Sequence, residues 1–180
     1  MFSRQKWIAA AVLAIAAIIY VNPISAAVPA DSTTPANRSV KESGKPYRIA
    51  DSEDEVYLLI DKSSHYLQVI LNSKSVLTFP VATGRGALTP SGVFTIANKI
   101  VNPWYLPGNI PGGDKRNPFG TRWMGLSIPY TGGYKYGIHG TNRPYSIGSS
   151  VSSGCIRMRN TDVEWLYRHI PIGTKVVIRD

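Results

Sequence analysis

The sequence predicts a mainly β domain with one short helix, and three observations support this prediction. Short runs of β-branched and aromatic residues recur from Val56 to Ile178, and turn-forming residues separate the first of these runs. Only one stretch, beginning at Thr161, has apolar residues at helical spacing. About 125 residues remain after the N-terminal segments are set aside, which is enough for one hydrophobic core.

The expected strands form an antiparallel meander, because short turn sequences at residues 61–64 and 72–74 join the first three runs. The strands are predicted at residues 56–60, 66–71, 76–81, 92–97, 123–128, 136–139 and 175–178.

The expected helix begins at a capping-box sequence. Thr161 and Glu164 have the spacing at which a hydroxyl and a carboxylate satisfy the free amides of a helix start. Pro171 ends the segment. The apolar residues at helical spacing are Val163, Leu166, Tyr167 and Ile170.

Residues 98–122 fit neither pattern and are predicted to form a long loop. Such loops are uncommon in compact domains and are often lids or binding loops. Two readings of Trp104 and Tyr105 stay open: these side chains line a substrate groove, or they pack the loop onto the domain.

The N-terminal segment has the layout of a secretory signal peptide. Arg4 and Lys6 precede an almost wholly apolar run at residues 7–21, and small residues precede the expected cleavage site after Ala27. An uncleaved membrane anchor is the alternative, although the run is shorter than the roughly 20 residues that span a bilayer. In either case the remainder of the chain is predicted to be exported, to a cell wall or periplasm.

The export prediction divides the chain into three segments. Residues 1–27 are the signal peptide or anchor, residues 28–54 are a flexible spacer rich in Pro, Ser, Thr and Ala, and residues 55–180 are the folded domain.

The chain is basic, with 20 Lys and Arg residues against 11 Asp and Glu residues and a formal charge of +9. Without Arg4 and Lys6 the balance is 18 against 11, or +7. A basic exported protein is attracted to anionic cell-wall polymers or a membrane surface, although the charge also suits plain solubility. The export sequence and the lack of a dense Lys/Arg block argue against nucleic acid as a partner.

Cys155 is the only cysteine, and in an oxidising compartment a cysteine without an intramolecular partner needs an explanation. One explanation is a small buried apolar residue. The other is a nucleophile whose thiolate is favoured by an adjacent imidazole, which His139 in a glycine-punctuated stretch would supply. The second reading predicts a pKa for the thiol below that of free cysteine. One Cys and three scattered His residues lack the ligand spacing of a metal site.

Two neighbours of the cysteine fit the nucleophile reading. Arg157 offers a positive charge for the thiolate or for a substrate carboxylate. Gly154 permits close backbone approach, and the amides of Gly154 and Cys155 are predicted to form an oxyanion hole.

These residues also resemble a known family. The run His-Gly-Thr at 139–141, the Ile-Gly at 147–148 and Ser-Ser-Gly-Cys-Ile-Arg-Met at 152–158 are similar to the catalytic domain of YkuD-type L,D-transpeptidases. The resemblance covers about residues 55–179 and includes Thr-Pro-Ser-Gly-Val-Phe at 89–94. It implies a single-domain L,D-transpeptidase-like β-sandwich or barrel, with the short helix after the cysteine segment.

The resemblance implies an exported enzyme that cross-links peptidoglycan stem peptides. Cys155 would be the nucleophile, releasing D-alanine from a tetrapeptide donor and forming a thioester, and His139 would be the general base. No metal or cofactor is implied. Ser153 departs from the commonest pattern, which has His at this position. The positions assigned to support or substrate binding are Arg157, Ser152, Gly154, Gly140 and Thr141.

Three alternatives remain open at this point. The same residues suit an L,D-carboxypeptidase with water as acceptor, and an enzyme that attaches a protein to peptidoglycan. A non-catalytic wall-binding module is a third alternative, against which the presence of both His139 and Cys155 argues.

Overall fold

The structure is a computed structural model that describes residues 55–180. The predicted signal peptide or anchor at residues 1–27 and the predicted spacer at residues 28–54 lie outside the described residues. Within residues 55–180, no helix combines the length and the apolar character needed to cross a membrane.

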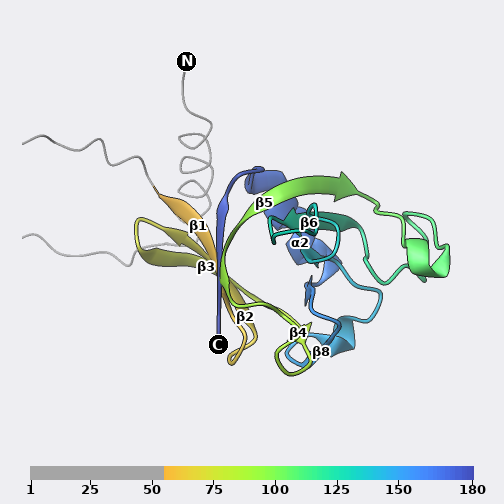
Figure 1. Cartoon of the computed structure of the whole chain (residues 1–180), viewed down its shortest axis with the longest axis horizontal. Helices are drawn as coiled ribbons and strands as arrows, with labels where there is room; N and C mark the ends of the chain where they lie inside the picture. Colours follow the sequence, from red (N-terminus) through yellow and green to blue (C-terminus); the bar gives the residue numbers. More distant parts are fainter. Residues whose placement is uncertain (1–54) are drawn as a thin grey trace, which may run out of the picture.

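One eight-stranded sheet, in the order β3-β2-β1-β10-β5-β6-β7-β9, forms the body of the domain, and β4 and β8 form a separate two-stranded sheet (Figure 1). The strands are β1 (Val56–Asp61), β2 (Tyr66–Leu71), β3 (Lys74–Pro80), β4 (Thr83–Gly84), β5 (Gly92–Val101), β6 (Arg122–Leu126), β7 (Gly137–His139), β8 (Ser150–Ser152), β9 (Ile156–Arg157) and β10 (Lys175–Arg179). The helix is α2 (Asn160–His169), and the 3₁₀ turns are η1 (Leu106–Gly108) and η2 (Pro144–Ser146).

Alternating burial explains why the first strand forms where it does. Val56, Leu58 and Ile60 are buried, while the residues between them are only partly covered, as expected for a strand with one face on the core. Leu58 pairs with Val69 on β2 and with Val176 on β10, and all three side chains are buried. The sheet therefore presents one continuous apolar face at this end.

The predicted antiparallel meander is confirmed for β1, β2 and β3 and again for β5, β6 and β7, but it is wrong for the pairings that join and flank these two groups. β10 inserts beside β1 in parallel, β5 pairs with β10, and β7 pairs in parallel with β9. Periodicity and turn residues predict that strands exist and that neighbouring strands form hairpins, but they carry no information about partners distant in the chain.

β5 gives the sheet its curl. It runs to Val101, four residues beyond the prediction, and its register against β6 shifts between Ile96 and Asn98. Such an irregularity bends a strand and increases its twist. In Figure 1, β5 arches over α2, whose Val163 and Leu166 are fully buried. The result is the predicted mainly β fold with one short helix.

The predicted capping box is wrong, although the helix itself is confirmed. The helix begins at Asn160, and its N-cap residue, Arg159, lies two residues before the predicted cap and makes no side-chain capping bond. The hydroxyl of Thr161 donates to Asp162 at 3.1 Å instead of capping the helix. Thr161 is already inside the first turn, so its side chain cannot serve as the cap.

Candidate active site

The parallel pairing of β7 and β9 brings the predicted catalytic residues to one face of the sheet. Ile138 pairs with Ile156 and His139 pairs with Arg157. Both isoleucines are fully buried in the core, so the alternation of side chains places His139 and Arg157 on the opposite face. Cys155 directly precedes Ile156 and therefore shares that face. Diagonal neighbours across two strands, with roughly 7–8 Å between their Cα atoms, are within reach of long side chains.

The thiol of Cys155 does not bond to the imidazole in this structure. Cys155 is a free cysteine, and its Sγ donates to the backbone carbonyl of Lys135 at 3.5 Å. No hydrogen bond joins it to His139 in the described part of the chain. The two groups share a face, and a rotation of the thiol away from Lys135 is needed to engage the base.

A network of hydrogen bonds fixes the turn that precedes Cys155. Ser152 Oγ donates to the carbonyl of Cys155 at 2.6 Å and accepts the amide hydrogen of Gly154 at 3.0 Å. Thr89 Oγ1 donates to the carbonyl of Gly154 at 2.9 Å. Gly154 has φ +123°, and a Cβ there would lie 2.6 Å from the carbonyl oxygen of Leu88, so only glycine fits. Ser152 thus occupies the Gly154 amide hydrogen in the resting structure, and the oxyanion hole formed by the amides of Gly154 and Cys155 stays a prediction.

His139 is held in a defined tautomer among aromatic rings. Its Nδ1 lies 2.6 Å from the carbonyl oxygen of Gly140, which can only accept, so Nδ1 carries the hydrogen and Nε2 keeps its lone pair. The Trp123 ring stacks on the imidazole with centroids 5.6 Å apart, and the Phe119 ring meets it edge-on at 5.0 Å. With 3% of its surface exposed, His139 is shielded from solvent.

Burial lowers the pKa of His139 from 6.5 to about 4. The backbone carbonyl of Gly140 raises this pKa and so opposes the effect of burial. The positive charge of Arg157 lowers the pKa further, and the backbone carbonyl of Phe119 raises it. At neutral pH the imidazole is therefore unprotonated and able to accept a proton.

Burial also raises the pKa of the Cys155 thiol above its ordinary value, and this outweighs the lowering by the Gly137 backbone and by Arg157. The prediction that this pKa lies below that of free cysteine is therefore wrong for the resting structure. The resting pair is a neutral thiol and a neutral imidazole, because the imidazole is buried and the half-buried thiol loses solvation that would favour its charged form.

Arg157 is fixed by its backbone and carries an uncompensated charge. Its amide and carbonyl exchange hydrogen bonds of 2.8 and 2.9 Å with Ala82. Burial and the neighbouring charge of Arg143 lower its pKa, whereas Cys155 acts in the opposite direction. Among residues 55–180 neither arginine forms an ion pair. The thiol thus lies near the positive charge of Arg157, which has a second cation, Arg143, beside it, and neither is paired with a carboxylate among the described residues.

An apolar groove of about 680 Å³ adjoins the site. Two of its walls, Phe119 and Trp123, pack on His139, and a third, Lys135, provides the carbonyl that holds the Cys155 thiol. The groove therefore shares three residues with the surroundings of the thiol and the imidazole, although neither Cys155 nor His139 lines it. Its lining residues are Ile100, Pro103, Trp104, Leu106, Pro107, Phe119, Trp123, Tyr134 and Lys135.

The long loop between β5 and β6 provides much of this groove. The loop is shorter than predicted, because β5 continues to Val101 and β6 begins at Arg122. Tyr105 fits the reading in which the side chain packs the loop onto the domain. Contact of Trp104 with a substrate stays a prediction. Trp104 lines the groove and is 52% exposed, whereas Tyr105 packs edge-on against Phe119 with centroids 5.1 Å apart.

Comparison with known proteins agrees with this geometry. A family model described as YkuD, L,D-transpeptidase catalytic domain, matches residues 55–178. The chain belongs to the L,D-transpeptidase family.

Two relatives from Bacillus subtilis illustrate the similarity. The putative L,D-transpeptidase YqjB is 47% identical over 125 residues, which is 69% of this chain and 71% of the relative. The putative L,D-transpeptidase YkuD is 41% identical over 123 residues, which is 68% of this chain and 65% of the relative. The matched region thus leaves about a third of these relatives uncovered.

Solved structures show the same fold. An L,D-transpeptidase from Mycobacterium tuberculosis aligns with a TM-score of 0.55 at 20% identity, covering 71% of this chain and 58% of that one. L,D-transpeptidase 3 of the same organism, in complex with a faropenem-derived adduct, aligns with a TM-score of 0.52 at 22% identity, covering 71% of this chain and 61% of that one. The predicted L,D-transpeptidase-like fold is therefore confirmed.

Several residues of this L,D-transpeptidase site were not predicted from sequence. Trp123 was expected only as part of a strand, and its stacking on the base follows from the pairing of Trp123 with His139 between β6 and β7. Phe119 and Lys135 lie in irregular segments that periodicity does not describe. Ser153, where the family commonly has His, is exposed. Within the described residues, no group of three or more His, Cys, Asp or Glu side chains is placed to hold a metal.

The lowered pKa of His139 predicts a specific loss of stability in mild acid. The unfolded chain takes up a proton at this residue near pH 6.5, whereas the folded chain does so only near pH 4, so the free energy of unfolding falls as the pH drops through this window. The shift corresponds to roughly 3 kcal/mol. Urea unfolding at intervals between pH 7 and pH 4 measures it. His139→Gln should lose less stability over the same range, and equal losses in both proteins would contradict the assigned cause.

Proposed function

We propose that this L,D-transpeptidase is an exported enzyme that cross-links peptidoglycan stem peptides through a thioester on Cys155. The main support is the common face of β7 and β9, on which a buried neutral imidazole, a free thiol and an unpaired arginine lie together beside an apolar groove. Family membership supports a reaction of the L,D-transpeptidase class.

In the proposed acylation step, His139 Nε2 takes the thiol proton as Cys155 Sγ attacks the carbonyl carbon that joins the L-centre of meso-diaminopimelate to the terminal D-alanine. The imidazolium then gives this proton to the nitrogen of D-alanine as the amide bond breaks. D-alanine leaves and the stem remains as a thioester.

In the second step the amine of another stem attacks the thioester carbonyl. His139 accepts a proton from this amine and returns it to the sulfur as the C–S bond breaks, which regenerates the neutral pair. The hydrogen bond from Nδ1 to the carbonyl of Gly140 supports the imidazolium in both steps, so no acidic third residue is required.

The remaining predicted site residues have supporting roles in this proposal. Ser152 and Gly154 shape the turn that presents the thiol, and Gly140 provides the carbonyl for the base. Thr141 Oγ1 accepts the amide hydrogen of Arg143 at 3.0 Å, which orders the start of η2. The groove would take the less polar part of the stem or its glycan.

Arg157 is assigned to a carboxylate of the donor stem. Arg157→Gln is expected to lower kcat/KM for a tetrapeptide donor by about 10- to 100-fold, mainly through KM, because a charge-assisted hydrogen bond of roughly 1.5–3 kcal/mol is lost. Steady-state kinetics with purified stems measures the effect. Arg168→Gln, an exposed arginine on α2, makes the same charge change as a control. Wild-type kinetics for Arg157→Gln would show that its charge is not used in binding.

The deciding experiment is a product assay on tetrapeptide stems followed by mass spectrometry. Cross-linked dimers would support the proposal. Tripeptides alone would favour the L,D-carboxypeptidase alternative, and products formed only with a protein amine would favour attachment of a protein to peptidoglycan. No product and no acyl-enzyme would leave the non-catalytic wall-binding module.

The proposal includes location and further partners. Export to the cell wall or periplasm would bring the site to its substrate, and the formal charge of +9 favours anionic wall polymers or a membrane surface as additional contacts. Cell fractionation with an antibody against the folded domain tests the location. Recovery in the cytoplasm would contradict it.

A further inference from the structure

The peptide group between Gly140 and Thr141 is hydrogen-bonded to the candidate base, His139. The carbonyl of Gly140 accepts the Nδ1 hydrogen of His139, and the amide nitrogen of this same peptide group belongs to Thr141. The Thr141 amide donates to Oδ1 of Asn160 at 3.0 Å. His139 and Asn160 are therefore bonded to opposite ends of one peptide group.

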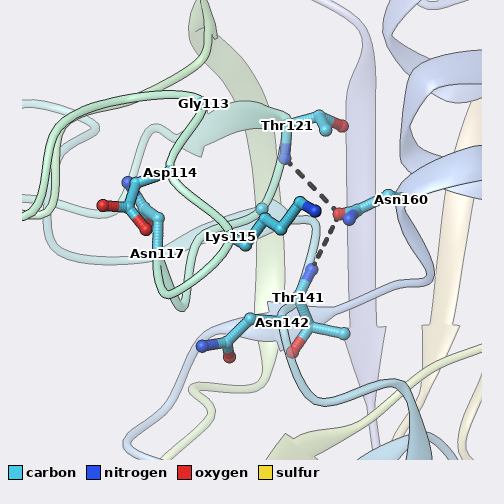
Figure 2. A pocket seen from close by; sticks show the side chains of 9 residues that line it. Gly113, Asp114, Lys115, Asn117, Thr121, Thr141, Asn142 and Asn160 are labelled. Carbon is cyan, nitrogen blue, oxygen red and sulfur yellow. Dashed lines mark hydrogen bonds between the residues drawn. The ribbon is translucent and has the colours of Figure 1, made fainter.

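The same oxygen also reaches the second segment that contacts the imidazole. Asn160 Oδ1 accepts the amide hydrogen of Thr121 at 3.4 Å, and Figure 2 shows this oxygen between the two backbone nitrogens. Thr121 lies two residues after Phe119, whose ring meets the His139 ring edge-on. Asn160 thus joins the two backbone segments that enclose His139.

The close approach of this side chain accounts for Gly140 and adds to the constraint at Gly120, whose φ of +63° and backbone contacts already favour glycine. A Cβ on Gly140 or on Gly120 would lie 2.1 Å from Asn160 Oδ1, which is too close for any side chain. Gly140 belongs to the His-Gly-Thr run that carries the family resemblance. Here, the oxygen of Asn160 occupies the space that a side chain would need.

The position of Asn160 in the helix makes the arrangement unusual. Asn160 is the first residue of α2, where Asn often bonds to the amides of its own helix. Its Oδ1 bonds instead to amides of two other segments. A hydrogen bond to the N–H of a peptide group orients that group and strengthens its carbonyl as an acceptor.

We propose that Asn160 is a positioning residue for His139, holding the Gly140–Thr141 peptide so that its carbonyl fixes the Nδ1–H tautomer and supports the imidazolium. The catalytic part of this inference rests on the proposed function. The effect on the tautomer does not rest on the proposed function, and it is measurable in the resting protein.

Asn142 provides a matched control. It lines the same polar pocket of about 150 Å³ as Asn160 (Figure 2), and Asn142→Ala removes the same side-chain group. However, its Nδ2 donates to the carbonyl of Arg116 at 2.7 Å, and its Oδ1 has no partner among the described residues. The side chain of Asn142 therefore makes no bond to the peptide that holds His139.

The test combines NMR of the 15N-labelled imidazole with kinetics of acylation. Wild type and Asn142→Ala should show the Nδ1–H tautomer of His139. Asn160→Ala should show a mixture of tautomers and a kcat lower by about 10²-fold, with KM nearly unchanged, because the base is misplaced and the substrate contacts are not. Asn160→Asp keeps an acceptor at the same place and should restore the tautomer and most of kcat.

Several results would overturn the inference. A pure Nδ1–H tautomer with wild-type kcat in Asn160→Ala would remove Asn160 from the support of the base. If Asn160→Ala does not fold, Asn160→Asp provides the test. Its carboxylate should raise the pKa of His139 in an NMR titration while the Nδ1–H tautomer persists. An unchanged pKa would contradict the link between residue 160 and His139. Lack of transfer activity in wild type would refute the proposed function but leave the NMR result intact.

Discussion

Cys155→Ala is expected to abolish the acyl-enzyme and to lower turnover of tetrapeptide stems by about 10⁴-fold or more, because no other group of the site can form the covalent bond. Mass spectrometry of the intact protein measures this directly. After incubation with the donor, wild type should gain the mass of the stem without D-alanine, and the variant should gain nothing. The replacement is small, and Cys155 is not in the fully buried core, so the fold should be retained.

The control for this prediction lies in the same turn. Ser153 is exposed, and Ser153→Ala should keep both the mass increase and the turnover. A covalent adduct on Cys155→Ala, or undiminished cross-linking by it, would show that the nucleophile lies elsewhere and would refute the thioester mechanism.

His139→Gln is expected to slow acylation by about 10²- to 10⁴-fold, with little change in KM, because the side chain keeps a hydrogen-bond donor for the Gly140 carbonyl but can no longer accept a proton. The pH profile provides a second readout. Protonation of His139, whose pKa is about 4, removes the base, so wild-type kcat/KM should fall as the pH drops toward and below this value. The residual rate of the variant should not show this acid limb.

His169→Gln is the matched control, since this histidine lies on α2, where it stacks on Trp165 and bonds to its backbone carbonyl. It should leave both the rate and the acid limb unchanged. An acid limb near pH 6.5 in wild type would mean that the base is more solvated than the 3% exposure of His139 indicates. Wild-type acylation by His139→Gln would exclude this residue from proton transfer.

A neutral resting pair has a consequence for reactivity. Since the thiolate is the reactive form, a half-buried neutral thiol that donates to the Lys135 carbonyl is a weak nucleophile before substrate arrives. In the proposed mechanism the thiol leaves that carbonyl and transfers its proton to His139 only when an acyl group occupies the face between them. This arrangement would limit side reactions of the cysteine before substrate binds.

Local patterns in the sequence were enough to predict most elements of the domain. Runs of β-branched and aromatic residues between turn residues predicted β1 and β2, and the helical spacing of Val163 and Leu166 predicted α2. The predicted cap, Thr161, lies two residues after the observed N-cap, Arg159, and its hydroxyl bonds to Asp162 within the helix. Motif residues also identified Cys155 and His139 as candidates, and their catalytic roles stay predictions.

Other features depended on contacts between distant segments. The parallel pairings of β1 with β10 and of β7 with β9 follow from how the curled sheet closes around its core. The burial that raises the pKa of Cys155 and lowers that of His139 follows from the same packing. The predicted lowering of the thiol pKa failed for this reason, since it considered the charges near the sulfur and not the loss of solvent.

By itself, then, the sequence determined the class of fold, the family and the identities of the groups able to do chemistry, because these depend on residue type and short-range spacing. Only the tertiary structure decided which protons those groups hold, which aromatic rings enclose the base and which amide oxygen supports it. These properties depend on solvent exclusion and on hydrogen bonds between segments that are far apart along the chain.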